Sequence, residues 1–350
     1  MMRITIDQRT LHFKQPAGTS RGVYTTRRSW LVTMSDGEHT GLGECAPLPR
    51  LSCDDLPHYG QVLRECCDEV ARTGVIPARD LSRYPSILFG LETAMRHLQG
   101  GNIDCRHGRQ LPVIYDTPFT RGEEGIPING LVWMGTHDEM LARLETKLKQ
   151  GYGCVKLKIG AIDFERELDL IAHIRERFTP EQVELRVDAN GGFTPACALK
   201  RLEALAPYGI HSIEQPVMAG QWQVMARLCQ DSPVPIALDE ELIGVNTRER
   251  KIELLDTIKP RYIILKPSLH GGIAGTQEWV QLATERGTGS WITSALESNV
   301  GLNAIAQLAA HIYGPHIEMP QGLGTGLLYT DNIAMPLEIK GDCLWTSIHS

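Results

Sequence analysis

Six charged residues stand at the ends of five short apolar segments in the middle of the chain. The segments follow one another at roughly 25 to 30 residues, a spacing typical of the strand–helix units of a parallel barrel. A strand buried in such a barrel carries a charge at high cost unless the charge is paired or binds a metal ion. We therefore interpret these residues as one chemical site, made of Lys156, Lys158, Asp188, Glu214, Asp239 and Lys266.

The acids of this group predict a metal site, and the lysines predict a proton-transfer step beside it. The three carboxylates are a hard oxygen donor set that suits Mg²⁺ first, with Mn²⁺ as the alternative. A lysine acts as a base only when its pKa is lowered, and a like charge two residues away or a nearby dication lowers it. Lys158 and Lys266 flank the acids, which favours abstraction of a proton α to a carboxylate. The competing interpretation is that the lysines are salt-bridge partners of the acids, and Lys156 is expected to be partly that.

Eight short strand-like segments, each followed by a helical stretch, must position these residues. They predict a parallel barrel, whose strands bring their carboxyl ends to one mouth. The segments are residues 126–128, 155–158, 185–188, 212–214, 236–239, 262–266, 291–294 and 316–319.

Strand parity predicts where the side chains point. Lys156 and Lys158 share the inward face, as do Asp188 and Asn190, whereas Leu157 and Val187 face the outer helices. Parity also turns Arg186 inward, without an assigned partner. The same rule directs Glu240 away from Asp239, which favours a supporting or structural role. His270 is interpreted as an ordinary loop histidine, and Glu297 as a residue that helps to organise the site without transferring a proton.

The first hundred residues have a different pattern. Segments 4–6 and 30–33 predict strands, SDGEHTG predicts a hairpin turn after the second, and residues 56–72 and 86–99 predict helices. This indicates a smaller α+β domain. We place it at residues 1–120, with residues 326–350 returning to it, and the barrel at residues 121–325.

Composition narrows the classes of partner. The 350 residues carry a net charge of −7 and nine cysteines without a CxxC motif. No apolar run approaches a membrane span, and the first residues lack the apolar core of a signal peptide. We expect a cytoplasmic protein with no nucleic-acid or membrane partner, whereas a small anionic substrate is compatible with this charge because a local site can oppose the global sign. The segments GGIAG at 271–275 and GLGTG at 322–326 fit no phosphate-loop pattern and are interpreted as turns.

The motif set resembles the enolase superfamily, muconate lactonizing enzyme subgroup. The resemblance covers nearly the whole chain and implies an α/β fold, a modified TIM barrel of (β/α)7β type with an α+β capping domain. It rests on KLK at 156–158, DAN at 188–190, EQP at 214–216, DE at 239–240, Lys266-Pro267, GLGECAPLP at 41–49 and PSILFGLETA at 85–94.

Within the subgroup the chain is most similar to the o-succinylbenzoate synthases, on IPING at 126–130 and SALESNVGLNAIAQLAA at 294–310. This resemblance implies a lyase that dehydrates 2-succinyl-6-hydroxy-2,4-cyclohexadiene-1-carboxylate in menaquinone biosynthesis. It assigns proton removal to Lys158 and enediolate stabilisation to Lys266. The other implied roles are metal binding for Asp188, Glu214 and Asp239, support for Lys156 and Asn190, and substrate contact for Arg21, Ser294 and Gly322.

Two alternatives stay open at this point. N-succinylamino acid racemases and dipeptide epimerases use the same two lysines, although the epimerase Asp-x-Asp motif is missing from residues 316–320. A barrel that serves only for binding or structure is a remote alternative, because all the catalytic residue types are present. The oligomeric state is not predicted.

Overall fold

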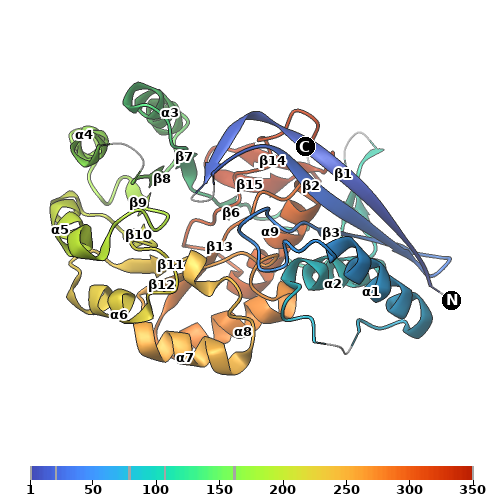
Figure 1. The fold of residues 1–350 in the computed structure, drawn as a ribbon. Helices are drawn as coiled ribbons and strands as arrows, with labels where there is room; N and C mark the ends of the chain where they lie inside the picture. Colours follow the sequence, from blue (N-terminus) through green and yellow to red (C-terminus); the bar gives the residue numbers. More distant parts are fainter. Residues whose placement is uncertain (1, 20–21, 78–79, 106–107, 161–162, 349–350) are drawn as a thin grey trace.

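The computed structural model describes residues 2–19, 22–77, 80–105, 108–160, 163–348, and it has two parts (Figure 1). The larger part is a sheet of parallel strands in which each strand pairs with its neighbour in the sequence. In chain order the strands are β7 (Gly130–Val132), β8 (Cys154–Lys158), β9 (Glu184–Asp188), β10 (Ser212–Glu214), β11 (Ile236–Leu238), β12 (Tyr262–Leu265) and β13 (Gly289–Ile292).

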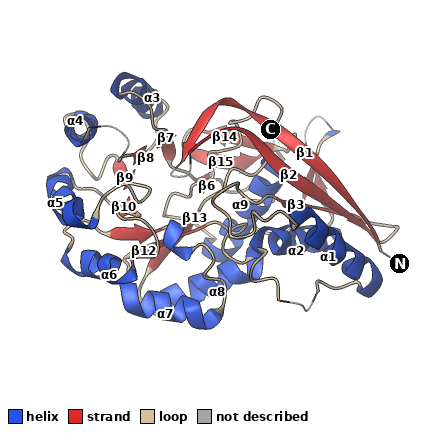
Figure 2. Cartoon of the chain, in the orientation of Figure 1, coloured by secondary structure: helices blue, strands red, loops and turns tan. Residues whose placement is uncertain are grey.

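A helix follows each of these strands and covers the outside of the sheet (Figure 2). Four begin with recognisable signals: a capping box at Thr136, a capping carboxylate at Asp163, a proline at Pro195 and a capping hydroxyl at Ser298. In chain order they are α3 (His137–Lys149), α4 (Phe164–Arg175), α5 (Pro195–Leu205), α6 (Trp222–Asp231), α7 (Arg248–Ile258), α8 (Gly272–Thr284) and α9 (Asn299–Tyr313).

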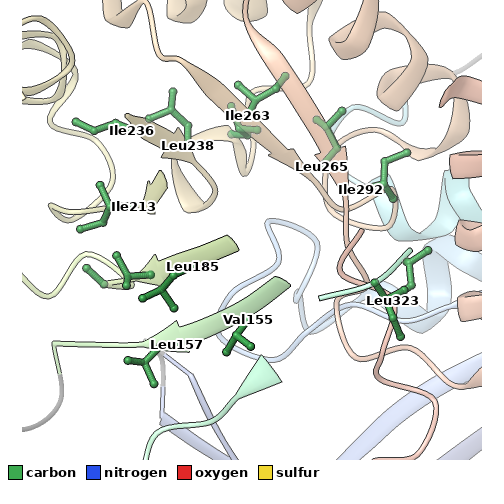
Figure 3. Packing of buried hydrophobic residues seen from close by; sticks show 14 of the residues in the cluster. Val155, Leu157, Leu185, Ile213, Ile236, Leu238, Ile263, Leu265, Ile292 and Leu323 are labelled. Carbon is green, nitrogen blue, oxygen red and sulfur yellow. The ribbon is translucent and has the colours of Figure 1, made fainter. Parts of the chain in front are cut away.

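The strand parity predicted for the outward face is confirmed. Leu157, Val187, Ile213 and Ile236 are in register across β8 to β11. All four belong to one buried cluster with apolar side chains of the surrounding helices, and Figure 3 shows this apolar layer around the strands. Because successive side chains alternate, the residues on either side of these positions face the interior of the barrel.

The eighth barrel position is filled by residues 321–322 and not by residues 316–319, so that predicted segment was wrong. Gln321 forms an isolated parallel bridge with Ile128, and Gly322 forms one with Thr293 beyond β13. Prolines at 315 and 320 bound the predicted segment, and His316 has a φ of 64°, which strand pairing does not accommodate. These two bridges place residues 321–322 between Thr293, which follows β13, and Ile128, which precedes β7.

The smaller part is an antiparallel meander with two helices against it. Its first two strands are much longer than predicted. The first, β1 (Arg3–Thr19), is an edge strand in which Leu11 and Ala17 are the only buried side chains among those described, so its sequence shows little apolar alternation. Glycines at 41 and 43 let a helix lie close to the last strand: a Cβ on Gly43 would be 2.0 Å from the Gly90 carbonyl oxygen. The other elements are β2 (Gly22–Ser35), β3 (Thr40–Cys45), α1 (Tyr59–Thr73) and α2 (Pro85–Gly100).

The last residues of the chain contact both parts. Tyr329 bridges Phe13 of β1, and Asp331 accepts hydrogen bonds from the backbone and ring of His12. β14 (Leu337–Lys340) pairs with β15 (Cys343–Thr346), and β15 pairs with β6 (Ile126–Pro127). The short strands β4 (Asn102–Asp104) and β5 (Gln110–Pro112) pair with each other. We propose the division at residues 120 and 121, with residues 326–350 spanning both parts. Among the described residues, no helix is long and apolar enough to cross a membrane.

Glu92 of α2 links the smaller part to the barrel. Its carboxylate oxygens accept the backbone N–H groups of Ile273 (2.5 Å) and Ala274 (3.2 Å) in the first turn of α8. A carboxylate there satisfies N–H groups that the helix leaves unpaired, and it complements the positive end of the helix dipole. Gly272, with a φ of 73°, leaves the space, because a Cβ would lie 2.4 Å from Glu92 Oε2. The GGIAG segment is therefore the N-cap and first turn of α8, and not the loop turn that was predicted.

Glu92 is expected to make the stability of the protein decrease as the pH rises. Burial raises the pKa of Glu92 to about 7, whereas the pKa of a glutamate in an unfolded chain is about 4.3. The folded state therefore binds the extra proton between these values, and the contribution of Glu92 to the free energy of unfolding falls as pH rises through this window. The wild-type free energy of unfolding minus that of Glu92→Gln is expected to decrease by about 2 kcal/mol between pH 5 and pH 8.

Chemical denaturation of both proteins at the two pH values measures this difference. Asp54, whose pKa burial raises to about 6, titrates in the same window, but it is present in both proteins and cancels in the comparison. A difference between the two proteins that does not change with pH would contradict the prediction.

Candidate active site

A cavity of about 640 Å³ lies at the carboxyl ends of the barrel strands. The smaller part covers it with Leu48 and Leu51, so a bound molecule would touch both parts. Among the residues that line the cavity are Trp133, Lys156, Lys158, Asp188, Asn190, Asp239, Glu240, Lys266, Ser294 and Gly322. The structure thus brings together most of the residues selected from the sequence, with Glu214 fully buried next to them.

Two lysines of β8 contact the acids on one side of the cavity. Lys156 Nζ donates to Glu214 Oε2 and lies 3.0 Å from Asp188 Oδ2. Lys158 Nζ donates to Asp188 Oδ2 at 3.1 Å and to Asn190 Oδ1 at 2.7 Å. The contacts follow from the register, because Lys158 pairs with Asp188 and Asp188 with Glu214 across three neighbouring strands.

Lys266 stands on the other side of the acids, directly after β12. Its Nζ donates to Asp239 Oδ1 at 2.5 Å and to Oδ2 at 2.6 Å. Its backbone N–H donates to Nδ1 of the buried His270 at 3.0 Å. The predicted arrangement, with Lys158 and Lys266 at opposite ends of a row of carboxylates, is therefore present as geometry.

The acids determine the charge state of this cluster. Burial raises the pKa of Asp188, but Lys156 and Lys158 outweigh this effect and hold it well below its usual range. Burial, together with Asp188 and Asp239, raises the pKa of Glu214 to about 8 although Lys156 opposes the shift. Burial lowers the pKa of Lys266, but Asp239 and Glu240 outweigh it and the pKa is raised. The pKa of Lys156 is raised for similar reasons, with Asp188, Glu214 and Asp239 outweighing burial.

The donor set fits a hard divalent cation. Three lysines face four carboxylates in this cluster, counting Glu240, so the acids exceed the ammonium groups. Among the described residues, Glu214 Oε1 has no hydrogen-bond partner although it is buried, and an unpaired buried polar oxygen is costly. In the described part of the chain no three His, Cys, Asp or Glu side chains are arranged to hold a metal ion, because the ammonium groups engage the carboxylates. A bound cation would displace them and lower the lysine pKa values.

Glu240 points toward the cavity, so its predicted direction was wrong. Strand parity holds only within a strand, and the chain turns into a short 3-10 helix (Glu240–Leu242) directly after Asp239. The turn brings Glu240 Oε1 to the side-chain amide of Asn190, which donates to it at 3.0 Å.

Trp133 is a cavity residue that the sequence argument missed. Lys158 Nζ lies 5.8 Å from the centre of its ring, within the range of a cation–π contact. The signal was in the sequence, because parity from Leu131, which is in register with Lys156, puts residue 133 on the same inward face.

The three residues expected to contact substrate have different outcomes. Ser294 and Gly322 both line the cavity, and Ser294 shares a hydrogen bond of 2.6 Å with the hydroxyl of Thr325. A Cβ on Gly322 would lie 2.2 Å from Thr293 Oγ1, so the wall is closely packed here. Arg21 lies outside the described residues.

Arg186 has partners at the floor of the barrel. Its Nε donates to Glu184 Oε1 at 2.7 Å, one amino group donates to the Pro320 carbonyl at 2.9 Å, and its guanidinium lies 4.3 Å from the centre of the Trp291 ring. Arg186 therefore closes the barrel below the lysines, with its side chain inward as predicted.

Residues 294–298 form part of the cavity wall. Hydrogen bonds connect them to the smaller part. Buried Arg27 donates to the carbonyl oxygens of Ala295 and Leu296 and of Ala46 and Pro47. Glu44 accepts hydrogen bonds from the backbone and hydroxyl of Ser298 at the start of α9.

Glu297 adds hydrogen bonds to the same segment from within the barrel. Its carboxylate accepts from Ser268 Oγ and, at 2.7 Å, from the Ala295 N–H. These contacts support an organising role for Glu297, because they tie the segment after β12 to the segment after β13.

Comparison with known proteins identifies the family. A family model described as "Enolase C-terminal domain-like" matches residues 139–345, and one described as "MenC, N-terminal domain" matches residues 13–98. The o-succinylbenzoate synthase of Desulfotalea psychrophila is 46% identical over 377 aligned positions, which cover 99% of each chain. The chain belongs to the o-succinylbenzoate synthase family of the enolase superfamily. The resemblance inferred from its motifs is therefore confirmed.

Solved structures agree with the family. The crystal structure of MenC from Desulfotalea psychrophila covers 99% of both chains with a TM-score of 0.82 and 42% identity. The L-Ala-D/L-Glu epimerase of Bacillus subtilis is 26% identical in sequence over 89% of this chain and 85% of its own. Its structure, at 21% identity and a TM-score of 0.78, has the same fold. The expected α/β fold class, a modified barrel with an α+β capping domain, is confirmed for this o-succinylbenzoate synthase family member.

Proposed function

We propose that the chain is a Mg²⁺-dependent o-succinylbenzoate synthase, a carbon–oxygen lyase of menaquinone biosynthesis. It would convert 2-succinyl-6-hydroxy-2,4-cyclohexadiene-1-carboxylate to o-succinylbenzoate by syn elimination of water. The observation that carries this proposal is the pair Lys158 and Lys266 at opposite ends of the carboxylate row, in a chain similar over its full length to an o-succinylbenzoate synthase. The nine cysteines are scattered through the chain without a CxxC motif, which supports a reducing compartment, and we propose the cytoplasm.

The two lysines have different parts in the elimination. Lys158 Nζ takes the proton from the carbon next to the ring carboxylate, which leaves an enediolate. The same ammonium group then gives a proton to the departing hydroxyl, so water leaves and the ring becomes aromatic. One group can serve as base and then as acid because both bonds break on the same face of the ring. Lys266, on the other face, stabilises the negative charge of the enediolate.

The remaining residues bind and orient. We propose Asp188, Glu214 and Asp239 as the ligands of Mg²⁺, with Mn²⁺ as a substitute, and Lys156 and Asn190 as supporting residues. The metal ion would supply electrostatic stabilisation of the charge that develops on the substrate carboxylate. A dipeptide epimerase from Enterococcus faecalis, 18% identical with a TM-score of 0.78, was crystallised with Mg and a dipeptide, which supports a metal in this fold. Ser294 and Gly322 are proposed to contact the succinyl side of a small anionic carboxylate, and Arg21 is proposed to contact the substrate from the capping domain.

A dehydration assay with the purified protein and the proposed substrate tests this function. In the presence of Mg²⁺ we expect o-succinylbenzoate to form, and its ultraviolet absorbance measures the rate. Removal of the metal with a chelator is expected to lower the rate by at least about 100-fold, since metal ions supply several kcal/mol of charge stabilisation. Added Mg²⁺ or Mn²⁺ should restore the rate. Full activity after exhaustive chelation would contradict the metal assignment.

A racemase or epimerase activity is the alternative that this assay must separate. The same lysines would then exchange the α-proton of an N-succinylamino acid or a dipeptide. Incubation of such a panel in D₂O measures the exchange by loss of the α-proton signal. Rapid exchange without dehydration would replace the proposed function by this one. A protein that does neither, and binds no Mg²⁺ in calorimetry, would be a binding or structural barrel.

A further inference from the structure

Lys158, Asn190 and Glu240 form a continuous chain of hydrogen bonds along the cavity wall. Lys158 Nζ donates to Asn190 Oδ1 at 2.7 Å, and Asn190 Nδ2 donates to Glu240 Oε1 at 3.0 Å. The three residues come from the ends of β8, β9 and β11 and line the same cavity. Lys158 and Glu240 are 8% and 9% exposed, so solvent competes little with these contacts.

The chain has only one favourable direction, because the two ends of a carboxamide differ. The oxygen accepts hydrogen bonds and the amino group only donates them, whereas an ammonium group is a donor and a carboxylate is an acceptor. Asn190 can therefore satisfy both neighbours with its oxygen toward Lys158 and its amino group toward Glu240. Rotation of the carboxamide by 180° would set two donors against each other at Lys158 and two acceptors at Glu240.

The backbone of Asn190 is held in place, so only the orientation of its side-chain amide remains to be determined. Its φ of 44° is in the left-handed region, which asparagine tolerates better than most residues. Its N–H donates to Asp188 Oδ1 at 2.9 Å, which holds the backbone beside the acids. Nothing in this backbone contact selects which end of the carboxamide faces Lys158, whereas Glu240 does.

We propose that Glu240 is a positioning residue for the reaction: it fixes the Asn190 carboxamide with its oxygen toward Lys158, and so directs the amine that transfers the proton. The inference rests on the proposed function, since it concerns the group assigned as base and acid. Asn190 Oδ1 gives Lys158 a neutral acceptor in addition to the charged Asp188. Glu240 thereby orients Lys158 through Asn190, while its charge also attracts the Lys158 ammonium group directly, so the variants must separate orientation from charge.

Two substitutions at position 240 separate orientation from charge. Both Glu240→Gln and Glu240→Leu remove the negative charge, but the glutamine oxygen can still accept from Asn190 Nδ2. Glu240→Leu is expected to lower kcat for dehydration by about 10- to 100-fold, as misplacement by about 1 Å does, with KM changed less than about threefold. Glu240→Gln is expected to keep kcat within about threefold of wild type. Mg²⁺ affinity, measured by calorimetry, should change equally in the two variants.

A double-mutant cycle with Asn190→Ala tests whether Glu240 acts through Asn190. If it does, Glu240→Leu has no further effect on kcat in the Asn190→Ala background. Glu240→Ala gives the same comparison with a smaller side chain if the leucine variant does not fold. Equal loss in the glutamine and leucine variants, wild-type kcat in the leucine or alanine variant, or additive effects in the cycle would each overturn the inference while wild-type dehydration stands. A wild-type protein without dehydration activity would overturn the proposed function, and the inference with it.

Discussion

Replacement of Lys158 by alanine is expected to lower kcat for dehydration by about 10³- to 10⁴-fold, at the upper end of what one acid–base group contributes. The expected loss is this large because the proposed reaction uses Lys158 twice, first to remove a proton and then to return one. Its Nζ is also the ammonium group that contacts both Asp188 and Asn190. Steady-state kinetics under saturating Mg²⁺ measure the effect.

A matched control separates catalysis from the loss of a lysine as such. Lys149 is exposed in the last turn of α3, and Lys149→Ala is expected to leave kcat unchanged. Thermal unfolding of both variants checks that the barrel is intact. Dehydration by the Lys158→Ala protein at a rate near that of the control would remove Lys158 from the role of base and acid.

Replacement of Lys266 by alanine is the second large effect, with kcat expected to fall by about 10²- to 10³-fold, the size of a lost electrostatic stabiliser. Lys266 donates to both oxygens of Asp239, so its removal frees that carboxylate. We therefore expect Mg²⁺ to bind the variant at least as tightly as wild type, because metal and ammonium compete for the same oxygens.

Calorimetry with Mg²⁺ and kinetics with substrate must be measured on the same preparation of the Lys266 variant. Lost turnover with retained metal binding would agree with stabilisation of the enediolate by Lys266. If turnover and metal binding fell together, Lys266 would be needed to assemble the metal site, and its assigned role would be wrong. Robust turnover would exclude any catalytic role for it.

The barrel and its charged cluster could be predicted because both follow from local pattern. In a parallel barrel the strand ends converge, so the order of Lys158, Asp188, Glu214 and Asp239 along the chain becomes their order in space. The fold class predicted from this spacing and the family implied by the resemblance of the motifs are both confirmed. The catalytic and metal-binding roles of the residues remain predictions for the variants described above.

The errors arose where regular structure ends. Parity failed at Glu240 because the strand gives way to a 3-10 turn, which rotates the next side chain into the cavity. The eighth strand was predicted at the wrong residues, because the isolated bridges of Gln321 and Gly322 leave no periodic pattern in the sequence. Contacts such as those of Arg27 with residues 295 and 296 join segments more than 250 residues apart, and no local pattern indicates them.

The hydrogen bonds that connect the smaller part to the barrel have a consequence for protein engineering. Glu44 and Glu92 come from the smaller part, yet they accept hydrogen bonds from backbone N–H groups at the starts of α9 and α8 in the barrel. A chimera that took residues 1–120 from a relative and kept this barrel would therefore exchange two carboxylates that support barrel helices and the anchor of residues 294–298, together with the cover of the cavity. Recombination at this boundary should succeed only when the donor supplies carboxylates at both positions, so the two parts are expected to be inherited as one unit.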